Sequence, residues 1–150
     1  CPMGNDDDEL MPRLAADAAV TAGLLDSGRT LAWVSGMTLL ITVLVWLLGH
    51  AVHSPALVGA VVMAAAQAFF AQRVRFDAGI FHFWASRWHH PLAAAADLAA
   101  FDACVGRQKP AAASVAADLA ERRRGAIRLL IWQTACAALQ LGFTVIALWP

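Results

Sequence analysis

The sequence predicts an all-α integral membrane protein with three transmembrane helices, an amino-terminal amphipathic helix and a cytoplasmic helical hairpin between the second and third spans. Three observations lead to this prediction. The 150 residues are 60% hydrophobic and only 15% charged, which is too apolar for an ordinary soluble domain. The apolar residues are gathered in three long runs. Lys and Arg are concentrated between the second and third runs, as expected of a cytoplasmic loop.

The predicted organisation has four segments in chain order. Residues 1–30 form an acidic tail and an interfacial helix, and residues 31–72 form a transmembrane helical hairpin. Residues 73–125 form a cytoplasmic helical extension and hairpin, and residues 126–150 form the third transmembrane helix.

The first segment begins with an acidic run and continues with an amphipathic pattern. Between Glu9 and Leu25, apolar residues recur at spacings of three and four, which is typical of a helix with one apolar face. Asp26, Ser27 and Gly28 predict a break between this helix and the first span. We expect the helix to rest on the inner membrane surface or against a partner.

Each apolar run is long enough to cross a bilayer. Residues 31–48 carry no charge and cover about 27 Å as a helix, close to the ~30 Å of hydrocarbon. Residues 55–72 begin with Pro55 at a position suited to the first helical turn. Residues 126–149 contain Arg128 near their start and are long enough to cross with tilt.

The distribution of basic residues predicts the orientation. Residues 49–54, which join the first two spans, contain no Lys or Arg, whereas residues 73–128 hold nine of the eleven. The positive-inside rule therefore places the amino terminus in the cytoplasm and the carboxyl terminus in the periplasm. The heavy use of Ala and Arg is typical of a GC-rich bacterial genome, so we expect a bacterial inner membrane. Aromatic anchors are expected at the span ends, at Trp33, Trp46, Trp132 and Trp149.

Beyond the second span the helical pattern continues without a breaker to Pro91, so the second helix is expected to project into the cytoplasm. Its apolar residues cover too much of its circumference for a lone helix in water. Two interpretations stay open, which are packing within this protein and a docking surface for a larger partner. The candidate docking residues are Phe76, Ile80, Phe81, Phe83, Trp84 and Trp88.

The rest of the loop predicts two further helices. Residues 91–105 form a short helix that begins at Pro91 and ends at Gly106. Residues 111–124 form a helix that runs, with a hinge at Gly125, into the third span. Arginines near the predicted membrane surface are expected either to fix the orientation of the spans or to bind anionic lipid headgroups. They are Arg73, Arg75, Arg122, Arg123, Arg124 and Arg128.

Polar residues inside the spans predict a hydrogen-bonded layer. Thr38, Gln67 and Gln133 fall at similar depth, about 7 to 11 Å from the inner boundary. Gln140 lies seven residues after Gln133 and extends the layer along the same helix face. Such bonds are weak, so their main effect is to specify which helix faces meet. A small-residue surface for close packing is predicted on the second span, at Gly59, Ala60, Ala64 and Ala68.

The candidate chemical residues predict neither an enzyme nor a cofactor. His50 and His53 are expected outside the membrane, whereas His82, His89 and His90 are expected inside, so the two groups cannot meet. The spans contain no interior histidine for haem, and no metal-ligand spacing is found. The sequence contains no nucleophile motif or phosphate loop. The predicted helix over residues 91–105 carries two carboxylates, which are expected only to make its surface soluble. They are Asp97 and Asp102.

These observations predict a non-catalytic accessory or assembly subunit of a larger inner-membrane complex, without cofactor or metal. A small homo-oligomeric transporter or channel is the first alternative. A membrane electron-transfer or metal-handling subunit that uses its histidines with a partner is the second. Nucleic acid is not expected as a partner, because the net charge is zero.

Overall fold

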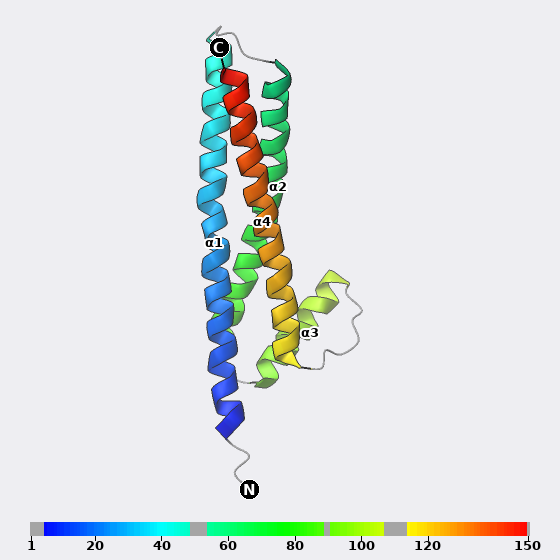
Figure 1. The fold of residues 1–150 in the computed structure, drawn as a ribbon. Coiled ribbons are helices and arrows are strands. Elements are labelled where there is room, and N and C mark those ends of the chain that lie inside the picture. The colour runs from blue at the N-terminus through cyan, green and yellow to red at the C-terminus, as the bar shows by residue number, and fades with distance from the viewer. Residues whose placement is uncertain (1–4, 49–53, 89–90, 107–113, 150) are drawn as a thin grey trace. The chain divides into compact units, whose positions relative to one another are not determined.

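The computed structural model describes residues 5–48, 54–88, 91–106 and 114–149. Four helices occupy these residues, α1 (Asn5–Leu47), α2 (Ser54–Arg87), α3 (Pro91–Val105) and α4 (Val115–Leu148) (Figure 1). The described part of the chain is thus all-helical and contains no strand. Three of the helices, α1, α2 and α4, are long and apolar enough to cross a membrane, as predicted.

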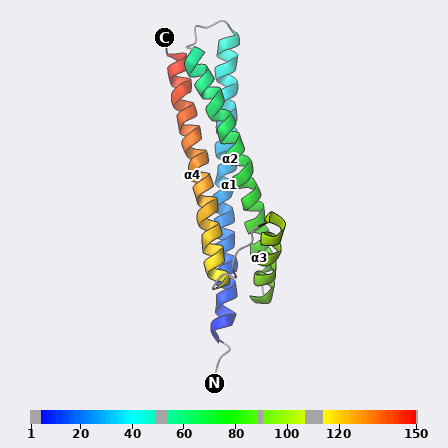
Figure 2. The same ribbon diagram turned by 90° about the vertical axis from the view of Figure 1, so that its right-hand side faces the viewer.

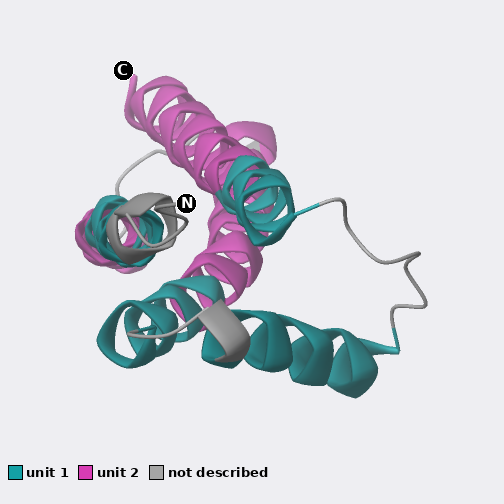
Figure 3. Ribbon diagram, turned by 90° about the horizontal axis from the view of Figure 1, so that it is seen from below, with its two compact units in different colours: residues 1–24, 77–126 teal, residues 25–76, 127–150 magenta. Residues whose placement is uncertain are grey.

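The chain divides into two compact units, coloured separately in Figure 3. Unit 1 consists of residues 1–24 and 77–126, and unit 2 of residues 25–76 and 127–150. Unit 1 contains the amino-terminal part of α1, the last turns of α2, all of α3 and the beginning of α4. Unit 2 contains the remaining parts of α1, α2 and α4.

Unit 2 is a bundle of three helical segments that run side by side (Figures 1 and 2). The carbonyl oxygens of Gly28 and Ser35 on α1 accept hydrogen bonds from Gln133 and Gln140 on α4, respectively. The order of these residues is the same along both helices, so α1 and α4 are parallel. Segment α2 is antiparallel to both. Its Val74 lies against Gly28, and near the other end of the span a Cβ on Gly59 would meet the ring of Phe143.

Buried positions recur every seven residues on each long helix. This spacing is typical of helices that pack side by side at a shallow crossing angle. On α1 the series is Leu14, Thr21, Gly28, Ser35 and Thr42. On α2 it is Ala60, Gln67, Val74 and Phe81. On α4 it is Leu119, Ala126, Gln133, Gln140 and Ala147.

The predicted break after the amino-terminal helix is wrong, because α1 is continuous from Asn5 to Leu47. Gly28 serves close packing and does not end the helix. A Cβ at this position would lie 2.8 Å from Oε1 of Gln133 and 3.1 Å from side-chain atoms of both Leu130 and Val74. The predicted hinge at Gly125 is also absent, since α4 continues through it. A single Gly inside a long, well-packed helix costs only about 1 kcal/mol.

The predicted extension of the second helix and the predicted bounds of the short helix agree with the structure, whereas the next helix, predicted to begin at residue 111, begins at Val115. Helix α2 extends to Arg87, far beyond the predicted end of its span at residue 72. Helix α3 begins at Pro91 and ends at Val105, and Gly106 follows it with a φ of +69°. This left-handed conformation suits glycine, which has no Cβ to clash with the backbone.

The outer surfaces of the two units differ in composition. Most of the large hydrophobic residues that are exposed lie in unit 2, distributed over all three of its helices. In the described part of unit 1 such residues are few, namely Leu10, Val20, Leu24, Phe83 and Val105. The outside of unit 2 is therefore of the kind that suits lipid, and that of unit 1 is not.

Candidate partner-docking site

The six candidate docking residues on α2 fall on two different faces. Phe81, Trp84 and Trp88 are buried, with 3% or less of each residue exposed. Phe76 and Phe83 are 63% and 49% exposed, and Ile80 is half-buried between them.

The buried aromatic residues form the core of unit 1. The ring of Trp84 stacks on Trp88 at a centroid distance of 5.3 Å and meets the edge of Phe81 at 5.4 Å. Phe101 of α3 completes the cluster, 5.9 Å from Trp84 in a T-shaped contact. The interpretation as packing within this protein therefore describes these three α2 residues, which offer no surface to a partner.

Arg122 is enclosed in this core, which corrects the expectation that its side chain is available to headgroups. Its side chain is only 6% exposed. Its Nη2 forms an ion pair with Oδ1 of Asp102 at 2.7 Å, without hydrogen-bond geometry, and its Nε donates to Oδ2 of Asp118 at 3.0 Å. The guanidinium also lies over the rings of Phe101 and Trp84, at 4.9 and 5.6 Å. Two carboxylates and two ring faces replace its hydration.

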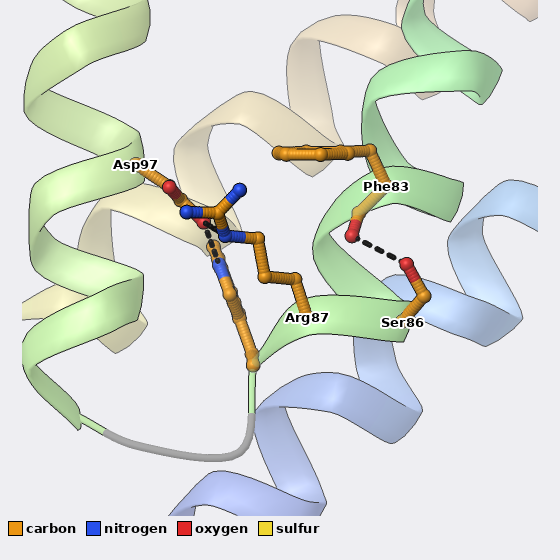
Figure 4. A network of polar contacts seen from close by, with 5 residues as sticks. Phe83, Ser86, Arg87 and Asp97 are labelled. Carbon is orange, nitrogen blue, oxygen red and sulfur yellow. Dashed lines mark hydrogen bonds and ion pairs between the residues drawn. The ribbon is translucent and has the colours of Figure 1, made fainter.

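The two carboxylates of α3 join this helix to its neighbours, so the expectation that they only solvate it is wrong. Asp102 pairs with Arg122 of α4. Oδ2 of Asp97 accepts a hydrogen bond from Nε1 of Trp88 at 3.3 Å and lies 3.6 Å from Nε of Arg87 (Figure 4). Sequence reasoning missed these contacts because the partners are on different helices.

A second face of α2, which we name the outer face of α2, carries three exposed aromatic rings, two exposed arginines and the half-buried Ile80. Its members are separated by alternating steps of four and three residues, the spacing of a helix-packing interface. They are Phe69, Arg73, Phe76, Ile80, Phe83 and Arg87. Two arginines lie against rings of the same face, Arg73 at 5.7 Å from the centroid of Phe69 and Arg87 at 5.3 Å from that of Phe83 (Figure 4).

The remaining candidate headgroup residues are exposed. Binding of anionic lipid headgroups by these arginines stays a prediction. They are Arg73, Arg75, Arg123, Arg124 and Arg128. Nε of Arg124 donates to the carbonyl of Ala120 at 3.4 Å, within its own helix.

The predicted polar layer is present in part, as a line of contacts between α1 and α4. Nε2 of Gln133 donates to the carbonyl of Gly28 at 2.7 Å, and Nε2 of Gln140 donates to that of Ser35 at 2.9 Å. The hydroxyl of Ser35 in turn donates to Oε1 of Gln140. Thr42 and Thr144 lie further along, with their hydroxyl oxygens 3.5 Å apart.

Two other members of the predicted layer behave differently. Thr38 lies outside it, since its hydroxyl donates to the carbonyl of Val34 in its own helix. Gln67 is buried, but its Nε2 has no hydrogen-bond partner among the described residues. Sequence reasoning missed Ser35 and Thr42. These two polar residues are seven positions apart on α1, the same spacing as that of Gln133 and Gln140 on α4.

The predicted small-residue surface is largely in contact with other helices. Ala60 and Ala64 are buried, whereas Ala68 is exposed. A Cβ on Gly59 would lie 2.9 to 3.0 Å from the ring of Phe143, so α4 approaches α2 closely here.

The candidate metal-binding residues are not gathered in the described segments. His82 is exposed, and His50, His53, His89 and His90 lie outside the described residues. Residues 5–48, 54–88, 91–106 and 114–149 contain no cluster of three or more His, Cys, Asp or Glu. Cys104 is exposed and Cys136 is buried, and both are free thiols.

Comparison with known proteins finds no matching family model, no similar curated protein and no similar solved structure. The outer face of α2 is the most distinctive exposed surface on the described part of unit 1 and its continuation along α2. It combines exposed aromatic rings, flanking positive charge and a fixed helical backbone.

Proposed function

We propose that this chain is a non-catalytic accessory or assembly subunit that docks onto a larger complex of the bacterial inner membrane. The observation that carries the proposal is the 49% exposure of Phe83, which lies in unit 1 on the part of α2 beyond its predicted span. Aromatic rings left in water cost free energy, and rings of this kind form the anchors of protein interfaces.

The inner side of α2 supports the same proposal, because it holds the outer face in place. Phe81 and Trp84 are packed in the core of unit 1, so the helix segment that carries Phe83 is fixed. The ring of Phe83 is also covered on one side by the guanidinium of Arg87. A partner that binds such a preorganised surface loses little conformational entropy.

The buried polar groups of unit 2 favour a packing role over a transport path. Gln133 and Gln140 bond to the backbone of α1, which uses their amide donors between helices of the same chain. Three helices enclose little volume for a substrate. The small oligomeric transporter is therefore less well supported than the docking subunit.

The proposal includes a topology and lipid contacts. Nine of the eleven basic residues lie between Arg73 and Arg128, which favours a cytoplasmic location of this segment. Exposed arginines near the predicted inner boundary, among them Arg73, Arg75 and Arg128, then meet anionic headgroups. Labelling of a single cysteine in this segment in intact cells tests the topology, and labelling from outside contradicts it.

The docking role is tested by extraction of the full chain from native membranes in a mild detergent. We expect the unaltered protein to migrate in a complex larger than the 15.9 kDa chain and to carry other polypeptides with it. The double substitution Phe76→Ser and Phe83→Ser is expected to release it. Val105→Ser is the matched control, because Val105 is 57% exposed but lies on α3. An unaltered protein that is a lone monomer contradicts the proposal.

A further inference from the structure

A second exposed face lies on α1 within unit 1. It consists of Asp17, Val20 and Leu24, which are three and four residues apart and therefore share one side of the helix. Val20 is 72% exposed, the highest value among the large hydrophobic residues that the structure describes, and Leu24 is 47% exposed. Both precede the predicted first span, which starts at residue 31, so lipid hydrocarbon does not cover them in the proposed topology.

The unit 1 part of the outer face of α2 has the matching pattern. Ile80, Phe83 and Arg87 are also three and four residues apart. When the two helices are read in opposite directions, Asp17 falls opposite Arg87, and Val20 falls within one residue, about 1.5 Å, of Phe83. Leu24 then falls opposite Ile80. One pair has opposite charges and two pairs are apolar, which is the composition of a complementary helix–helix interface.

Along their own helices, the two faces are at similar distances from the contact between Gly28 and Val74. In unit 2, Gly28 of α1 lies beside Val74 of α2. Val20 is eight residues from Gly28 along α1, and Phe83 is nine residues from Val74 along α2. At 1.5 Å per residue these distances are about 12 and about 13.5 Å. The bilayer holds every copy of a membrane protein at one depth, so the two faces of different copies meet without a shift.

We propose that the outer face of α2 binds α1 of a second copy of this chain. The two helices are antiparallel. The carboxylate of Asp17 in one copy pairs with the guanidinium of Arg87 in the other, and Val20 and Leu24 cover Phe83 and Ile80. This inference rests on the proposed function and names the occupant of the docking face within the assembly.

A symmetric pairing of two α2 helices is a poorer solution. Two copies in the same orientation would place Arg87 opposite Arg87, and Arg73 opposite Arg73, at equal depth, which brings like charges together. The contact of Arg87 with Asp97, at 3.6 Å, does not prevent the proposed pairing. The Arg87 side chain is 59% exposed, and its guanidinium has five donors.

The charge distribution of the chain supports the same contact. Six of the eleven acidic residues lie within the first 26 residues, whereas nine of the eleven basic residues lie from Arg73 onward. Each copy therefore offers an acidic amino-terminal helix and a basic surface on α2 and α4. Contacts between copies bring the two together.

Disulfide cross-linking between two differently tagged full-length chains tests the proposal in membranes. Val20→Cys in one chain and Phe83→Cys in the other are combined with Cys1→Ser and Cys104→Ser in both. We expect a cross-linked product that carries both tags. Ala19→Cys is the matched control, because Ala19 is exposed but lies on another side of α1, and it is expected to give at least tenfold less product. Failure of the first pair to cross-link overturns the inference.

A charge exchange provides a second readout. Asp17→Arg and Arg87→Asp are each expected to dissociate the copies, because each places like charges at the contact, and the double variant is expected to restore the assembly. If Phe83→Ser releases the chain from its complex while no cross-link between Val20→Cys and Phe83→Cys forms, another protein occupies the face. In that case the inference fails and the proposed function stands. If Phe83→Ser with Phe76→Ser leaves the complex unchanged, both fail.

Discussion

Units 1 and 2 bury polar groups in opposite ways. In unit 1 the interior holds a guanidinium, Arg122, between two carboxylates and two aromatic rings. In unit 2 the polar groups described inside are uncharged amides and hydroxyls, and those of Ser35, Gln133 and Gln140 bond across α1 and α4. The outside of unit 2 is largely apolar, whereas the described part of unit 1 exposes few large hydrophobic residues.

This difference fits the proposed topology, in which unit 1 lies in water and unit 2 in lipid. In water, burial of aromatic rings drives packing, and an ionic group can be enclosed if its charge is matched. In lipid, the surroundings are as apolar as the helix surfaces, so helices associate through close contact and interhelical hydrogen bonds. Gly28 and Gly59 provide such close contact in unit 2. The following substitutions test this comparison.

The largest effect is expected for Arg122→Met in unit 1. The substitution removes the cation that Asp102 and Asp118 share in a mostly buried site, where their side chains are 19% and 6% exposed. Removal of one partner from a buried ionic group costs about 3–5 kcal/mol. We expect rapid amide hydrogen exchange in α3 and early proteolysis of this helix, while the exchange of the helices in unit 2 remains slow.

Arg123→Met is the matched control for this experiment. Arg123 is the next residue of the same helix and is exposed, so its loss is expected to leave the exchange of α3 unchanged. Equal exchange in the two variants would show that the Arg122 cluster does not stabilise unit 1. Unit 1 would then not differ from unit 2 in the way described.

Arg122 also shows where sequence reasoning reaches its limit. Hydropathy predicted the three long helices, and Pro91 and Gly106 predicted the extension of α2 and the bounds of α3, because these signals depend on neighbours in the sequence. The roles of Arg122 and Asp102 depend on contacts between α3 and α4, which no local pattern records. Arg122 and Arg123 are alike in sequence context, yet one is enclosed and the other is exposed.

The candidate docking site was predicted to a similar extent. The sequence indicated that α2 carries more aromatic surface than a lone helix can expose, and the structure divides that surface into an inner and an outer face. The seven-residue spacing of Phe69, Phe76 and Phe83 is visible in the sequence, but so is that of Val74, Phe81 and Trp88. Packing against α3 and α4 decides which of the two series is buried.

An intermediate effect is expected for Gly28→Ala in unit 2. The added Cβ would lie 2.8 Å from Oε1 of Gln133, so the amide must move and its hydrogen bond to the Gly28 carbonyl is strained. Overpacking of this kind costs about 1–3 kcal/mol. Unfolding of the purified protein in mixed micelles, followed by circular dichroism, measures the change in free energy.

Gly36→Ala is the control for close packing, because a Cβ at Gly36 meets nothing within 4 Å. It is expected to be neutral or to stabilise the helix by up to about 1 kcal/mol, since Ala has the higher helix propensity. A Gly28→Ala protein as stable as the Gly36→Ala protein would remove the evidence that close approach holds α1 against α4.

The smallest effect is expected for the hydrogen bonds between α1 and α4. Ser35→Ala and Gln140→Leu, taken singly and together, form a double-mutant cycle on the bond from the Ser35 hydroxyl to Oε1 of Gln140. The coupling energy of an interhelical hydrogen bond in a membrane is about 0.6 kcal/mol on average and rarely exceeds about 1.7 kcal/mol.

Thr38→Ala is the control for this cycle. The Thr38 hydroxyl donates to a carbonyl of its own helix at 2.9 Å, so this substitution is expected to show no coupling to Gln140. A coupling energy within the range measured for such bonds would mean that these amides select which helix faces meet. A value several-fold larger would contradict this, because unit 2 would then depend on its polar interior as strongly as unit 1 depends on Arg122.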